Sequence, residues 1–99
     1  MRVFGLALGL ALCLAGQGSA QSIERACLKS DRYAKTRALC GCIQQAADLM
    51  LSTDDQQLAA SFFRDPHKAQ EIRQSGHRNN ERFWDRYKEY AATAVKYCS

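Results

Sequence analysis

The chain is poor in the residues that interrupt helices and form tight turns. Its 99 residues include a single proline, Pro66, and six glycines, of which only Gly41 and Gly76 follow residue 20. A fold built from short strands needs many turns, and turns rely heavily on these two residue types. Their scarcity therefore disfavours a β-rich architecture.

Beyond the first 20 residues the chain also lacks a long apolar run and a strong excess of charge. The full chain of 99 residues has 14 Lys and Arg residues against 10 Asp and Glu residues, a net charge of +4. Nucleic-acid-binding domains concentrate basic residues far more densely, so we expect no nucleic-acid partner. A helix needs about 20 apolar residues to span a bilayer, so we expect no membrane-embedded domain after residue 20.

No recognised catalytic motif is present. The sequence has no Gly-x-Ser-x-Gly segment, no phosphate-binding loop and no metalloprotease pattern, and its only histidines are His67 and His77. Ser75 lies two residues from His77, a separation that rarely orients a nucleophile and its base for proton transfer. We therefore expect no enzymatic activity, no catalytic residue, no metal site and no cofactor.

Residues 1–20 have the pattern of a secretory signal peptide. A short basic start is followed by the apolar run 3–15 and by a small-residue cleavage site, Gly18-Ser19-Ala20. Cleavage after Ala20 would leave one domain, residues 21–99, with a net charge of about +3. We expect this domain to be periplasmic or secreted.

The predicted mature chain keeps four cysteines, Cys27, Cys40, Cys42 and Cys98. Small exported domains with an even number of cysteines are typically stapled by disulfides, because their cores are marginal. Cys40 and Cys42 lie about 200° apart around a helix, so each is expected to bond to a different neighbour. Cys27–Cys40 with Cys42–Cys98 is slightly favoured, because the joint after the first helix is short. Cys27–Cys42 with Cys40–Cys98 stays open.

Apolar residues that recur at three- and four-residue steps predict an all-α bundle of four to five short helices. The expected helices cover about residues 22–28, 33–51, 54–64, 66–74 and 78–97. Asp65-Pro66 is a helix start with Asp65 as N-cap, and Thr53 with Gln56 has capping-box spacing. The expected core positions are Leu39, Ile43, Ala46, Ala47 and Met50, then Leu58, Phe62 and Phe63, and finally Phe83, Tyr87, Tyr90, Ala94 and Cys98.

The last predicted helix carries the candidate interaction surface. Arg78, Arg82 and Arg86 fall on one flank, and Trp84 lies about 100° from the centre of the core stripe. One interpretation is a solvated face with ion pairs such as Arg86–Glu89. The other is a shallow site for an anion or a partner, with arginine forks as donors and Trp84 as a platform. We predict a non-enzymatic interaction module that contacts an envelope protein or an anionic surface.

Two other functions are compatible with the residues. Cys40-Gly41-Cys42 could form a reducible pair or hold a metal, which would make the protein a thiol redox or metal-handling factor. A small-ligand accessory of a transporter is the third alternative.

Three segments and the last cysteine carry a resemblance that covers nearly all of residues 21–99. They are Cys40-Gly41-Cys42-Ile43-Gln44, Phe62-Phe63-x-Asp65-Pro66 and Phe83-Trp84-x-Arg86-Tyr87, followed by Cys98. The chain resembles a group of short exported bacterial proteins without an established activity, some of which carry the label "arginine transporter". The resemblance implies a binding accessory rather than a channel, because a bundle without a spanning segment cannot carry a solute through a bilayer.

Overall fold

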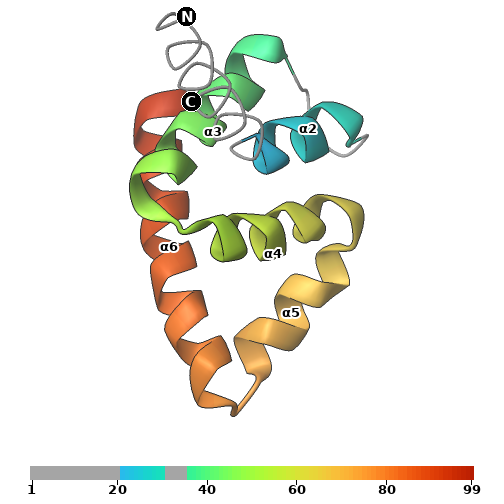
Figure 1. Ribbon diagram of the computed structural model, residues 1–99, viewed down its shortest axis with the longest axis vertical. Coiled ribbons are helices and arrows are strands. Elements are labelled where there is room, and N and C mark those ends of the chain that lie inside the picture. Colours follow the sequence, from blue (N-terminus) through green and yellow to red (C-terminus); the bar gives the residue numbers. More distant parts are fainter. Residues whose placement is uncertain (1–20, 31–35) are drawn as a thin grey trace, which may run out of the picture.

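The computed structural model describes residues 21–30 and 36–99, and these form α-helices and no strand. The helices are α2 (Ser22–Lys29), α3 (Arg37–Met50), α4 (Thr53–Arg64), α5 (Pro66–Gln74) and α6 (Arg78–Cys98) (Figure 1). The predicted all-α class is thus confirmed. The predicted signal peptide lies outside the described residues.

The five helices form two connected groups. In Figure 1, α4 extends from the middle of α6, and α5 returns from the far end of α4 to the start of α6, so that these three helices outline a triangle. Helix α2 packs on α3 and α4, and α3 packs on α6. The long helix α6 therefore links both groups.

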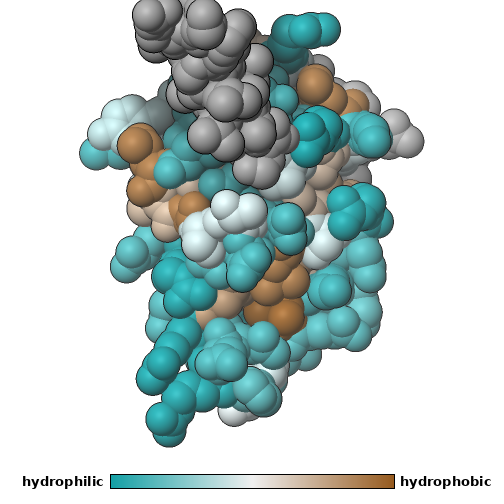
Figure 2. All heavy atoms as spheres, viewed as in Figure 1, coloured by the Kyte–Doolittle hydropathy of each residue, from teal (hydrophilic) through white to brown (hydrophobic). Residues whose placement is uncertain are grey.

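The core changes in character between the two groups. Around α2 it consists of one large side chain, Ile23, and small ones such as Ala26, Ala47 and Ala60, all buried. Small residues let helix backbones approach one another closely. Inside the triangle the core is aromatic, and hydrophobic residues are visible there in Figure 2, within a largely hydrophilic face. Phe62 contacts the ring of Tyr87 edge-to-face at 5.2 Å.

Helix α3 begins later than its sequence pattern predicts, and of its expected core positions only Ala46 and Ala47 are fully buried. Thr36 has an extended backbone and its hydroxyl accepts a hydrogen bond from the Leu39 amide at 3.0 Å, so Thr36 is the N-cap and the predicted start at residue 33 is wrong. The most buried positions are Cys40, Gln44, Ala46 and Ala47. Leu39, Ile43 and Met50 are only half-buried, because α3 presents its Cys40–Gln44 side to α2 and α4.

The cap of α4 is also displaced by one residue. Ser52, not Thr53, is the N-cap, and its hydroxyl accepts from the Asp55 amide at 3.1 Å. Gln56 is therefore free to turn inward. The predicted restart at Pro66 is confirmed, but the Asp65 side chain makes no capping hydrogen bond.

Two disulfides staple the helices. Cys27–Cys40 joins α2 to α3, and Cys42–Cys98 joins α3 to the end of α6. This is the pairing that the short joint after the first helix slightly favoured, and the crossed alternative is wrong. Both terminal helices of the described domain are therefore bonded to α3.

A buried network of glutamine side chains holds α2 against α3 and α4. Helix α2 has no side-chain N-cap, and the Glu24 amide in its first turn donates instead to Gln44 Oε1 at 2.9 Å. Gln44 Nε2 donates to Gln56 Oε1 at 2.8 Å, and Gln56 Nε2 donates to the Leu51 carbonyl at 3.1 Å. Buried amides need such partners, so the network fixes how the three helices are placed.

Candidate functional site: a basic groove between two helices

The four residues predicted as an interaction surface on α6 do not form one site. Arg78 and Arg82 are exposed, and no ion pair holds either of them within the described part of the chain. Trp84 is half-buried and stacks on Tyr87 with ring centres 5.2 Å apart, so Tyr87 covers one of its faces. Only one side of the indole is left for a ligand.

Arg86 is committed to a contact within the fold. Its Nε and Nη2 donate to the two carboxylate oxygens of Asp55, at 2.6 and 3.0 Å. These hydrogen bonds raise the pKa of Arg86 above its ordinary range. The expected pair with Glu89 does not form, because the guanidinium reaches across to the first turn of α4. Arg86 therefore joins α6 to α4, and its guanidinium is not free to donate hydrogen bonds to an anion.

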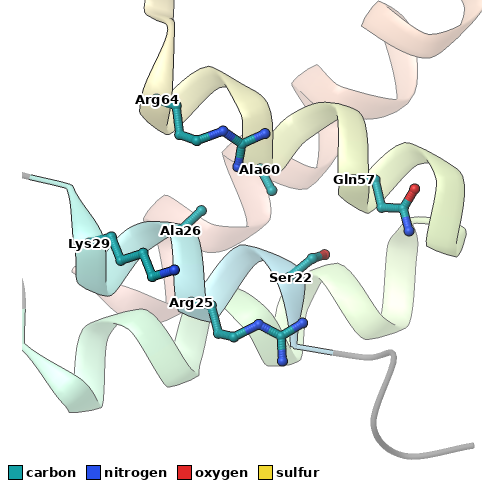
Figure 3. Close-up of a pocket in the computed structure, with 7 residues that line it drawn as sticks. All are labelled: Ser22, Arg25, Ala26, Lys29, Gln57, Ala60 and Arg64. Atoms are coloured by element: carbon teal, nitrogen blue, oxygen red, sulfur yellow. The ribbon is translucent and has the colours of Figure 1, made fainter.

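A different basic site lies where α2 packs on α4. A groove of about 420 Å³ runs between the two helices, and Figure 3 shows residues of both along it. Its walls bring Ala26 of α2 and Ala60 of α4 near each other, and both are buried. Because these side chains are short, the backbones pack closely while the longer side chains beside them stand at the rim.

Three cations line this groove: Arg25 and Lys29 from α2, and Arg64 from the end of α4. All three are exposed, and none forms an ion pair within the described residues. The other lining residues are Ser22, Ala26, Gln57 and Ala60, so no described carboxylate lines the groove. Three like charges without counter-charges favour an anion between them.

Ser22 adds an unsatisfied donor to the same wall. Its Oγ is buried and has no hydrogen-bond partner, and its side chain points towards the α4 side of the groove (Figure 3). A buried hydroxyl without a partner costs about 1–3 kcal/mol. An acceptor atom that reached this oxygen would remove that cost.

The signals for this site along the chain are weak. Lys29 and Arg64 lie in the last turns of their helices, where cations are common because they interact favourably with the helix dipole. Each therefore looks like an ordinary end-of-helix charge. Only the packing of α2 on α4, which are separated by α3 in the chain, turns them into one cluster.

A second groove, of about 350 Å³, lies between α3 and α6 and is mainly apolar in character. Leu49 and Tyr97 line it and are exposed by 87% and 71%, and the Cys42–Cys98 bridge forms part of its wall. None of its described lining residues is charged. It offers contact area but no group that would select a ligand.

The described residues contain neither a metal-binding cluster nor a membrane-spanning helix. Within residues 21–30 and 36–99, no group of three or more His, Cys, Asp or Glu side chains could hold a metal ion. No helix of this part of the chain is both long and apolar enough to cross a membrane.

The comparisons with known proteins add no relative. No family model, no curated protein and no solved structure matches the chain. The function of this protein is therefore inferred from its residues and their geometry.

Proposed function

We propose that this protein is an exported, non-enzymatic binding module that holds an anionic group of a partner in the groove between α2 and α4. The observation that carries the proposal is that Arg25, Lys29 and Arg64 all line one groove that no described carboxylate lines. Export is supported by the two disulfides, since such bonds persist in oxidising compartments.

The proposal that the protein is not an enzyme rests on where its two histidines, the candidate general bases, lie. His67 and His77 are exposed, and neither lines the basic groove. His67 lies 3.9 Å from Glu71 on the surface of α5. Neither imidazole is thus positioned to act on a ligand in the groove.

The two other functions considered from the sequence receive no support from the geometry. Cys40 and Cys42 belong to different disulfides, so they do not form a reducible pair with each other. An accessory that holds arginine would need carboxylates to receive the guanidinium, whereas the groove presents three positive charges. A cationic amino acid would be repelled there.

The proposal is tested by calorimetric titration of the protein recovered from the exported fraction, with citrate as a polyanionic probe. We expect saturable binding at low salt, weakened about tenfold or more by Arg25→Ala or Arg64→Ala, because each removes a charge-assisted hydrogen bond. Lys88→Ala removes an exposed cation that is paired with Asp85 on α6 and should leave the affinity unchanged.

The sequence-based alternative is tested in the same titration. If the double variant Arg78→Ala/Arg82→Ala abolishes binding while the groove variants retain it, then α6 is the binding surface and the groove is not. Absence of saturable binding in the wild type would also contradict the proposal.

A further inference from the structure

We infer that the basic groove takes a phosphate monoester, with its dianionic phosphoryl group held by Arg25, Arg64 and Lys29 and hydrogen-bonded by Ser22. This inference rests on the proposed function and specifies its ligand. It is based on the number of charges in the groove, on the kind of hydrogen-bonding groups that line it, and on the size of the groove.

The charge count favours a dianion. The groove presents three cations from two helices and no described carboxylate. A single carboxylate is satisfied by one arginine fork and would leave two of these charges uncompensated. A phosphate monoester carries about −1.5 to −2 charges near neutral pH, which matches the groove more closely.

The hydrogen-bonding groups that line the groove favour a ligand whose oxygens are all hydrogen-bond acceptors. Arg25, Lys29 and Arg64 can only donate, and the Ser22 hydroxyl lacks an acceptor. The three terminal oxygens of a phosphate monoester dianion are acceptors without a proton of their own. The donors come from both walls, Ser22 from α2 and Arg64 from α4, so a tetrahedral group can be held from two sides.

The groove is larger than the phosphoryl group requires. Its volume of about 420 Å³ lies within the range of small-ligand sites. The methyl groups of Ala26 and Ala60 supply apolar contact beside the cations. This leaves room for the organic part of a monoester, which can belong to a small metabolite or to a phospholipid headgroup.

The test compares two phosphoryl probes, each with a charge-matched probe, on the same protein at low salt. Glycerol 3-phosphate represents a free monoester, vesicles of phosphatidic acid in phosphatidylcholine represent the headgroup, and succinate is a dianion without phosphorus. We expect glycerol 3-phosphate, or the phosphatidic acid vesicles, to bind at least about fivefold more tightly than the charge-matched probe of the same format. For the vesicles, that charge-matched probe is phosphatidylcholine mixed with a fatty acid to equal surface charge.

Ser22→Ala supplies the sharper readout. We expect it to weaken phosphoryl binding by about tenfold, as loss of a hydrogen bond to a charged group does. Its thermal midpoint should not fall, because the variant removes a buried hydroxyl that has no partner in the unbound protein. Lys88→Ala is the control for each probe and should bind like the wild type.

The outcomes separate the two proposals. Equal affinity for succinate and glycerol 3-phosphate, together with no phosphatidic acid preference, would overturn the phosphoryl inference and leave the anion-binding function standing. Unchanged phosphoryl binding in Ser22→Ala would also overturn the inference. If neither citrate nor any phosphoryl probe binds, both proposals fail. Solution binding alone would identify a free monoester, and vesicle binding alone would identify a headgroup.

Discussion

Tyr90 illustrates how much a single side chain contributes to this small fold. Its ring is buried in the stripe of α6, and its hydroxyl donates to the Ile43 carbonyl of α3 at 3.1 Å. Burial, with a smaller contribution from Tyr87, raises the pKa of Tyr90 well above its ordinary value of 10.0. Tyr90 thus stays neutral in the folded protein at pH values where it ionises in the unfolded chain.

We expect Tyr90→Phe to lower the free energy of unfolding by about 1 kcal/mol at pH 7, the typical net value of one hydrogen bond. In the wild type, stability should fall as the pH rises above about 10, because the unfolded chain then binds fewer protons than the folded one. The variant should lose this part of the dependence. Urea denaturation at several pH values measures both effects.

Tyr97→Phe is the matched control, because Tyr97 is largely exposed. Its stability at pH 7 should lie within about 0.5 kcal/mol of the wild type. An equal loss of stability in both variants would mean that the Tyr90 hydrogen bond makes no specific contribution.

At the scale of the helices, the Arg86–Asp55 pair bridges α6 and the first turn of α4. Asp55 is well shielded, with 13% of its side chain exposed, and Arg86 is half-exposed. Asp55 also lies in the first turn of α4, where a carboxylate is favoured by the helix dipole. The pair therefore fixes the register of α6 against the start of α4.

We expect Arg86→Ala to destabilise the protein by about 0.5–1 kcal/mol, the range of partly exposed ion pairs. A double-mutant cycle with Asp55→Asn should give a coupling energy of similar size, reduced in 1 M NaCl by screening. Arg82→Ala, one turn earlier and without a partner among the described residues, should leave stability unchanged. A coupling energy of zero at low salt would show that the pair does not support the fold.

At the scale of the whole molecule, the two disulfides differ in loop length and in exposure. Cys27–Cys40 encloses a separation of 13 residues and both cysteines are buried, whereas Cys42–Cys98 encloses 56 residues and is half-exposed. Chain-entropy arguments assign contributions of about 3 and about 4 kcal/mol to such loops. A domain of this size depends on both.

We therefore expect a mild reductant to open Cys42–Cys98 first in the folded protein, because an attacking thiolate must reach a sulfur. Cys42→Ser/Cys98→Ser should lose about 4 kcal/mol of stability, more than Cys27→Ser/Cys40→Ser. Alkylation of the freed thiols followed by peptide mass mapping identifies the first bond to open. Earlier opening of Cys27–Cys40 would contradict the exposure argument.

Much of the local structure follows from the sequence alone. The helix over Pro66–Gln74 and the start at Arg78 agree with the predicted bounds, because Asp65-Pro66 and Ser75-Gly76 act on their immediate neighbours. The all-α class follows from the same local patterns. The four cysteines predicted two disulfides, and the angle of about 200° between Cys40 and Cys42 around the helix predicted that these two bond to different partners.

The tertiary structure alone decided which faces are buried and where the basic site lies. Gln44 and Gln56 were not among the expected core positions, yet both are buried, and Gln44 donates to Gln56. For Arg86 the sequence predicted either a pair with Glu89 or a donor to a ligand, whereas its partner is Asp55, 31 residues away. Arg25 and Arg64 line the same groove only because α2 packs on α4. Such contacts depend on long-range packing, which periodicity along one helix does not encode.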